Sequence, residues 1–217
     1  MRVVHCITGL TGDGAQRMLL RLVGQLQGRG VQNHIVSLSR REPLADCFEE
    51  VGASVECVNM SGFSNLMAGL PRLLRVVHEA APDILQGWMY HSNLLLSLVQ
   101  PFLKVRVPLV WNIRRGMDDY HERKLMTRVV TRAHRGLSRY PRAIVYCTRE
   151  SRVQHEAFGL SPKRGVVIGN GFDTSVFAPS EEMRRVVRKR LGVLDTEILV
   201  GNIGRDDIAK GRQFLFE

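Results

Sequence analysis

The stretch RVVHCITGLTGDGAQRMLLRLVGQLQGRG (residues 2–30) carries the signals of a strand, a turn and a helix in succession. Its first residues are mostly β-branched or apolar, as in a buried strand. Gly9, Gly12 and Gly14 follow. Apolar residues then recur at steps of three and four, as on one face of a helix; these are Met18, Leu19, Leu22, Val23 and Leu26.

The same alternation continues along the chain. Further strand-like runs occupy residues 33–38, 54–60, 83–89, 108–113, 143–148, 165–170 and 197–204. Amphipathic segments of helical periodicity lie between them. Alternation of this length predicts a parallel sheet covered by helices on both faces. We expect the α/β class, with a doubly wound Rossmann-like sheet.

A change in composition near residue 172 divides the chain. Gly169, Gly171 and Pro179 interrupt regular structure, and Ser180 then caps a predicted helix. A new strand-like run follows that helix. We expect an amino-terminal domain over residues 1–172, and an interdomain segment with the first strand, turn and helix of an incomplete second domain over residues 173–217.

Composition excludes several classes of protein. The 217 residues are 44% hydrophobic and 24% charged, as in a globular protein. The four cysteines show no disulfide or zinc-site spacing, and no metal site is expected. No signal peptide is recognisable and no apolar run approaches about 18 residues, so we expect a cytoplasmic protein that does not span a membrane. A formal net charge of +10 favours an anionic partner.

The glycine turn after the first strand is a candidate anion site. Glycines let the backbone approach a ligand, and free N–H groups at a helix start can bind phosphate. Gly12 and Gly14 are the candidate residues, and a purely structural turn is the alternative. Arg40 and Arg41 stand where a dinucleotide site would need an acidic residue, so the pattern disfavours that class.

Polar residues also follow two later strands. His91, Ser92 and Asn93 come after the run at 83–89, and Arg114 and Arg115 come after the run at 108–113. Ligands of open α/β sheets bind outside the carboxyl ends of the strands, so these residues are candidates to bind an acceptor or an anion. A helix-capping histidine and solvated arginines are the alternatives.

A basic helix is predicted over residues 119–139. One face is expected to carry apolar residues, namely Met126, Val129, Val130, Ala133 and Leu137. The rest of the helix is rich in cations, including Arg123, Lys124, Arg128, Arg132 and Arg135. Such a helix suits anionic lipid headgroups, so we expect these five cations to face a membrane. Packing of the apolar face on the chain's own sheet is the alternative.

The last motif is GRDDIAKG (204–211), in which Arg205 ends a strand-like run and Lys210 stands near a predicted helix start. Two cations at one turn would neutralise a departing diphosphate.

Taken together, VVIGNGFDTSVFAP (166–179) and VGNIGRDDIAKG (200–211) resemble the interdomain segment of the retaining glycosyltransferases of family 4. The shared positions are Asn170, Gly171, Asp173, Phe177, Pro179, Gly204, Arg205, Lys210 and Gly211. Gly169 replaces the usual proline and Phe172 the usual valine. The glycine turn resembles the family's amino-terminal glycine loop. WMYHSN (88–93) and WNIRRG (111–116) resemble members that build cell-surface polysaccharides.

The resemblance implies the GT-B fold and transfer of a sugar from a nucleotide diphosphate sugar with retained configuration. Arg205 and Lys210 would hold the donor diphosphate, and Gly12 and Gly14 would line the cleft beneath it. His91 would contact donor or acceptor as a candidate catalytic residue. The acceptor would be lipid-linked or a polysaccharide. No metal or other cofactor is implied.

Family members continue through most of a second Rossmann-like domain, so the resemblance implies that this chain is a fragment and inactive by itself. The alternatives are a non-catalytic binder of anionic lipid or glycan, and one subunit of a split enzyme with a carboxyl-terminal partner. Nucleic-acid binding is disfavoured, because the basic helix has only Tyr120 and Tyr140 at its ends.

Overall fold

The computed structural model describes residues 1–60 and 63–204, and it gives the backbone alone for residues 63–68. The chain divides into two compact units, Met1–Asn170 and Gly171–Glu217. Each unit is described by itself below.

The first unit is built on a parallel sheet, and its described residues form seven strands in the order β3-β2-β1-β4-β5-β6-β7. Every neighbouring pair is parallel. The strands are β1 (Arg2–Ile7), β2 (Gln32–Ser37), β3 (Ser54–Cys57), β4 (Ile84–Trp88), β5 (Leu109–Ile113), β6 (Ala143–Tyr146) and β7 (Gly165–Val167). The predicted doubly wound Rossmann-like fold is therefore confirmed.

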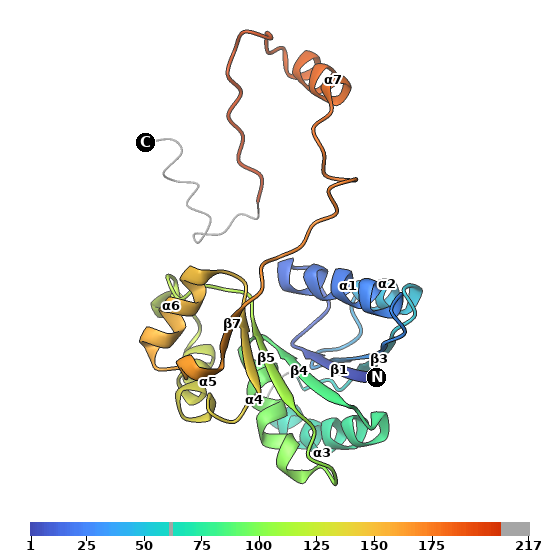
Figure 1. Ribbon diagram of the computed structural model, residues 1–217, viewed down its shortest axis with the longest axis vertical. Coiled ribbons are helices and arrows are strands. Elements are labelled where there is room, and N and C mark those ends of the chain that lie inside the picture. Colours follow the sequence, from blue (N-terminus) through green and yellow to red (C-terminus); the bar gives the residue numbers. More distant parts are fainter. Residues whose placement is uncertain (61–62, 205–217) are drawn as a thin grey trace. The chain divides into compact units, whose positions relative to one another are not determined.

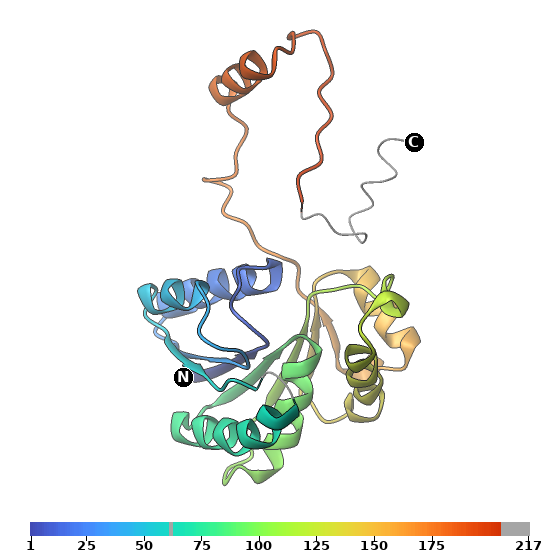
Figure 2. The same ribbon diagram turned by 180° about the vertical axis from the view of Figure 1, so that it is seen from behind.

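Helices connect the strands and cover both faces of the sheet. They are α1 (Gly14–Gln27), α2 (Leu44–Glu50), α3 (Phe63–Ala80), α4 (Met89–Val99), α5 (Leu125–Leu137) and α6 (Arg149–Phe158), with short 3-10 turns η1 (Gln100–Phe102), η2 (Tyr120–Glu122) and η3 (Pro162–Arg164). Helices α1 and α2 lie on one side of the sheet and α3 and α4 on the other (Figure 1; Figure 2).

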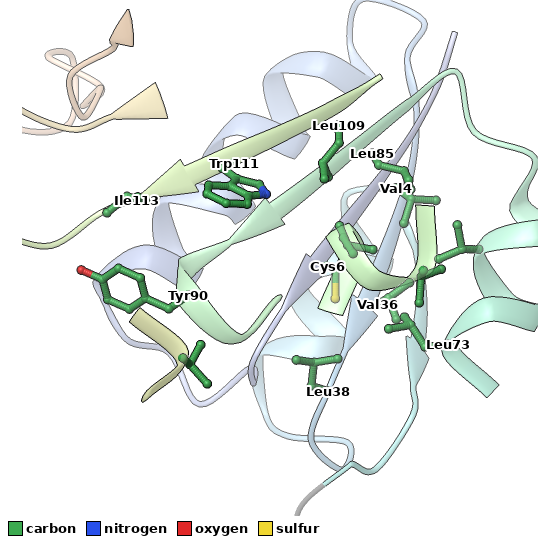
Figure 3. Close-up of a cluster of buried hydrophobic side chains, with 14 of the residues drawn as sticks. Val4, Cys6, Val36, Leu38, Leu73, Leu85, Tyr90, Leu109, Trp111 and Ile113 are labelled. Carbon is green, nitrogen blue, oxygen red and sulfur yellow. The ribbon is translucent and has the colours of Figure 1, made fainter. Parts of the chain in front are cut away.

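Side chains of the strands alternate between two cores. From β1, Val4 and Cys6 join the larger core with Trp111, whereas Ile7 joins the smaller one with Trp88. Figure 3 shows the larger core, which β1, β2, β4 and β5 share with the helices beside them. Because both faces bury side chains, most strand residues are apolar, as is typical of a parallel sheet. The polar residues His5, Asn33 and Gln86 are hydrogen-bonded to one another through His5.

The second unit contains one regular helix among its described residues, α7 (Glu181–Leu191). Ser180 caps it by accepting a hydrogen bond from Met183 N at 3.2 Å, as predicted. The strand predicted at 197–204 is not formed. Ile198 is 92% exposed, and no strand within the described residues of this unit lies beside it. A strand needs a neighbour for its backbone hydrogen bonds, whereas a helix supplies its own.

Candidate functional site

The candidate site lies where the strand order reverses, at the carboxyl ends of β1 and β4. Helix α4 starts directly after β4, and its first residue, Met89, has a left-handed φ of 68°. A Cβ added to Gly87 would lie 2.8 Å from Asn93 Cα and 2.4 Å from its Oδ1. Glycine at 87 therefore lets the helix fold back tightly against β4, which brings its first turn to the sheet edge.

The glycine loop, residues 9–14, reaches the same edge from β1. Gly12 has φ of 103°, where glycine is favoured. Gln16 Oε1 accepts hydrogen bonds from Asp13 N at 3.0 Å and from Gly12 N, and a Glu42 carboxylate oxygen accepts one from Leu10 N. The two side chains fix the loop from opposite ends. Some of the N–H groups expected to bind phosphate are thus bonded within the protein.

His91 lies half-buried on the first turn of α4. Burial lowers the pKa of its imidazole below the usual value. Within the described residues no hydrogen bond holds the ring. A neutral imidazole at this edge is able to accept a proton or to orient a hydroxyl group.

Ser92 and Asn93 lie in the interior, both at 0% exposure, and this corrects the expectation that they contact an acceptor or an anion. They occupy the inner side of the first turn of α4, with Asn93 beneath Gly87 and Ser92 against the buried Cys6 thiol. Because α4 begins at Met89, only the outer side of this turn faces the sheet edge. Ser92 and Asn93 therefore pack the helix on the sheet.

Arg114 follows β5, and its guanidinium lies 5.4 Å from the ring centroid of Trp88 at the end of β4. Its Nη1 donates to Ile168 O and to Asn170 Oδ1, each at 3.0 Å. Burial lowers its pKa, and no carboxylate within the described residues forms an ion pair with it. A partly buried cation without a counter-ion favours an anionic ligand.

Arg115 has a different environment, because it forms an ion pair with Asp119. The same carboxylate accepts from Arg123 Nη2 at 2.8 Å. The Arg123 side chain is only 4% exposed, and this corrects the expectation that it faces a membrane. Asp119 draws Arg123 inward, since a buried cation is stable only beside an anion.

Arg123 also begins a buried chain of hydrogen bonds. Its Nη1 donates to the hydroxyl oxygen of Tyr90 at 3.1 Å, and that hydroxyl donates to His155 Nε2 at 2.8 Å. His155 Nδ1 donates to Ser151 O at 2.6 Å, and Ser151 Oγ donates to Arg115 O at 2.8 Å. Burial lowers the pKa of His155 to about 4, so its ring is neutral as this chain requires.

This network holds the arginine loop, residues 114–119, on the first turn of α4 and on α6. Met117 N donates to Gln154 Oε1 at 2.7 Å, which adds a further bond from α6. Sequence reasoning missed the network. The four-residue spacing from Arg115 to Asp119 and from Asp119 to Arg123 was its one local signal, since the contacts with Tyr90 and His155 are set by the fold.

Helix α5 packs through only part of the predicted apolar face, since Val130 and Leu137 join the core. Val130, Thr131 and His134 are buried, while Met126 and Val129 are 66% and 51% exposed. His134 packs against the rings of Trp111 and Tyr90 and donates from Nδ1 to Val130 O at 2.7 Å. Polar residues share this buried face because the fold supplies their partners, so apolar periodicity placed Val130 and Leu137 correctly and Met126 and Val129 wrongly.

The outward side of α5 therefore combines exposed apolar and basic side chains. This α5 surface comprises Lys124, Leu125, Met126, Val129, Arg132 and Arg135, with the half-buried Arg128 at its margin. In the described part of the chain, no helix is both long and apolar enough to cross a bilayer.

Two of the predicted donor-binding residues, Arg205 and Lys210, lie outside the described residues. Within residues 1–60 and 63–204, no group of His, Cys, Asp and Glu side chains is arranged to hold a metal ion. The candidate site therefore consists of the glycine loop, His91 and Arg114.

Comparisons with known proteins agree on the architecture. The sequence profile of Glycosyltransferase Family 4 matches residues 12–176. Anabaena Alr3699/HepE in complex with UDP is 16% identical, with a TM-score of 0.71 over 88% of this chain and 50% of that chain. The lipopolysaccharide outer core galactosyltransferase WaaB in its apo form is 12% identical, with a TM-score of 0.61 over 80% of this chain and 46% of that chain.

A third solved structure, MurG of Acinetobacter baumannii, is 12% identical, with a TM-score of 0.55 over 80% of this chain and 47% of that chain. The chain thus spans about half the length of the solved structures that it matches. A search of curated protein sequences found no significant match.

Proposed function

Because this chain belongs to Glycosyltransferase Family 4, we propose that it forms the acceptor-binding half of a retaining glycosyltransferase. The whole enzyme would transfer a sugar from a nucleotide diphosphate sugar to a lipid-linked or polysaccharide acceptor. HepE, whose structure contains UDP or UDP-glucose, supports this class of donor.

The observation that carries the proposal is Arg114, a half-buried cation without a carboxylate partner in the described chain, at the sheet edge that also carries His91. A diphosphate leaving group gains negative charge as the glycosidic bond breaks, and cations fixed nearby stabilise that charge. In this proposal Arg205 and Lys210 hold the donor diphosphate, while Gly12 and Gly14 line the cleft beneath it. His91 would orient the acceptor hydroxyl.

The acceptor side of the proposal includes a membrane. Leu125, 71% exposed, and Met126 lie beside Lys124 on the α5 surface, and apolar and cationic side chains together suit an anionic bilayer surface. We propose that the protein associates peripherally with the cytoplasmic face of the membrane, where a lipid-linked acceptor would be found.

Calorimetry with inorganic pyrophosphate tests the anion site. We expect the 217-residue chain to bind pyrophosphate, and Arg114→Met to weaken binding by about tenfold or more, since a charged hydrogen bond is worth about 1.5–3 kcal/mol. Arg139→Met, at an exposed arginine away from this edge, is the matched control. Equal affinities for both variants would contradict the proposal.

Vesicle sedimentation tests the membrane contact. We expect binding to phosphatidylglycerol vesicles and much weaker binding to phosphatidylcholine vesicles. The double variant Leu125→Ser, Met126→Ser should bind less, whereas Val153→Ser on α6, which removes an equally exposed apolar side chain, should bind as the parent chain does. Equal loss in both variants would argue against the α5 surface.

Two alternatives make different predictions. A non-catalytic binder of anionic lipid or glycan would bind vesicles and leave UDP-glucose unbound even when a carboxyl-terminal half is supplied. A subunit of a split enzyme would acquire transferase activity with that half, and we propose that the chain alone is inactive. Sugar transfer by the purified 217-residue chain would overturn that last point.

A further inference from the structure

Arg114 holds the chain where the first unit ends. Its two acceptors, Ile168 O and Asn170 Oδ1, lie just after β7, and Asn170 is the last residue of that unit. Among the described residues, this segment also bonds to the sheet through Ile168 N, which donates to Tyr146 O at 2.9 Å. Arg114 is thus the side chain through which the candidate site contacts residues 168–170.

Packing by the described residues constrains this segment little at Gly169. A Cβ added there would meet no atom within 4 Å, so packing does not require glycine at this position. Asn170 is exposed. A glycine beside an exposed residue allows the backbone several paths, so the contacts of Arg114 matter for the path taken at residues 168–170.

The guanidinium uses only part of its hydrogen-bonding capacity in these contacts. Nη1 makes both bonds, while Nε is buried and has no partner within the described residues. Phosphate groups bind arginine best through two parallel N–H donors. The two donors are either Nε with Nη2 or Nη1 with Nη2. Because Nε is buried and Nη1 already donates to Ile168 O and Asn170 Oδ1, a phosphate that binds in this way must displace the guanidinium from its present contacts.

We propose that Arg114 is an anion-operated latch on residues 168–170. A diphosphate at the sheet edge draws the guanidinium away from Trp88, breaks its bonds to Ile168 and Asn170, and frees the segment that leads out of the first unit. The inference rests on the proposed function for its ligand class. The diphosphate belongs either to a nucleotide sugar or to a lipid-linked acceptor.

Hydrogen exchange of peptides spanning residues 168–176 tests the latch. Saturating inorganic pyrophosphate should speed exchange in the parent chain by about five- to thirtyfold, the effect of losing one or two hydrogen bonds. Arg114→Met should exchange fast without any ligand, and Arg139→Met should behave as the parent chain. Slow exchange in Arg114→Met would overturn the latch whether or not pyrophosphate binds.

The variant Asn170→Ala distinguishes competition for Arg114 from a contact that has no effect on anion binding. If bonding to Asn170 and binding of the anion compete for Arg114, linkage requires this variant to bind pyrophosphate more tightly, by about fivefold for one lost hydrogen bond. Unchanged or weaker binding would contradict the competition. Asn170 is exposed, so the variant should fold.

The failures of the two proposals are distinguishable. Absence of pyrophosphate binding by calorimetry would remove the anion site of the proposed function, whereas binding without faster exchange at 168–176 would remove the latch alone. UDP and farnesyl diphosphate, compared at equal saturation, separate the sources of the diphosphate. Faster exchange with UDP alone assigns the latch to the donor, and faster exchange with farnesyl diphosphate alone assigns it to the acceptor.

Discussion

The unit Met1–Asn170 buries side chains of its strands on both faces, whereas in the unit that begins at Gly171 most apolar side chains of the described residues lie in solvent. Leu85 and Trp111 are completely buried, while Val186 on α7 is 55% exposed and Ile198 is 92% exposed. Helix α7 nevertheless forms. It has acids in its first turn, bases in its last turn and a capping serine, all of which act locally.

This difference between the two units separates structure that forms from local interactions from structure that needs tertiary contacts. A helix satisfies its backbone within one segment, so α7 needs no neighbour in order to be recognisable. The apolar run at 197–204 has the composition of β4 or β5, which have a strand on each side, yet no strand within residues 1–60 and 63–204 pairs with it. Stability in this chain should therefore come almost entirely from the first unit.

Core truncation is the strongest test of that difference. We expect Leu85→Ala to lower the free energy of unfolding by about 2–5 kcal/mol, because it leaves a cavity between the sheet and its helices. Val186→Ala on α7 should change it by less than about 0.5 kcal/mol. Urea unfolding followed by circular dichroism measures both. Similar losses would show that α7 packs in a core after all.

Acid should affect the two units unequally, because all seven histidines lie at or before residue 155. Burial lowers the pKa of His5, His134 and His155 to about 4 in the folded protein, from an ordinary value near 6.5. Between these values the unfolded chain binds more protons, so stability falls as pH falls. Each histidine contributes at most about 1.4 kcal/mol per pH unit.

The loss of stability with falling pH can be followed by measuring urea unfolding midpoints from about pH 7 to about pH 5. His155→Gln should flatten the dependence, since glutamine keeps a neutral acceptor for Tyr90 and does not titrate. Protection factors of the α7 amides should show no matching trend. A midpoint that stays constant over this range would contradict the buried, neutral state of the three rings.

Two helix caps give the finest comparison. Thr148 Oγ1 accepts from Ser151 N at 3.0 Å at the start of α6, as Ser180 does at the start of α7. Thr148→Ala should lower global unfolding stability by about 1 kcal/mol, and Ser180→Ala should reduce the protection of α7 alone. Thr148→Ser and Ser180→Thr keep the hydroxyl groups and serve as controls. A global effect of Ser180→Ala would mean that the units unfold together.

Most of the fold could be predicted from the sequence, because its signals are local or periodic. Seven strand-like runs became strands, and the cap at Ser180 was found where expected. The run at 197–204 did not form a strand, and no strand in the described part of the chain pairs with it. The inner face of α5 was assigned correctly only at Val130 and Leu137, since Thr131 and His134 are buried through tertiary contacts that periodicity does not reveal.

The candidate site was harder to predict, because residue type does not give direction. Arg114 and Arg115 look equivalent in the sequence, yet one lies over Trp88 and the other pairs with Asp119. Ser92 and Asn93 follow His91 immediately and point inward. The location of the site could be predicted from the sequence, because the strand order places it at the carboxyl ends of β1 and β4.

The backbone carbonyls of Ser151 and Val130 have a consequence for spectroscopy. Each receives a hydrogen bond from the Nδ1 of a histidine four residues later, His155 or His134, and a carbonyl can only accept. Both imidazoles are therefore fixed as the tautomer protonated at Nδ1, which is the minor form of free histidine. The two nitrogens of each ring should therefore give well-separated NMR signals. These signals would report on the packing of the domain interior without any added probe.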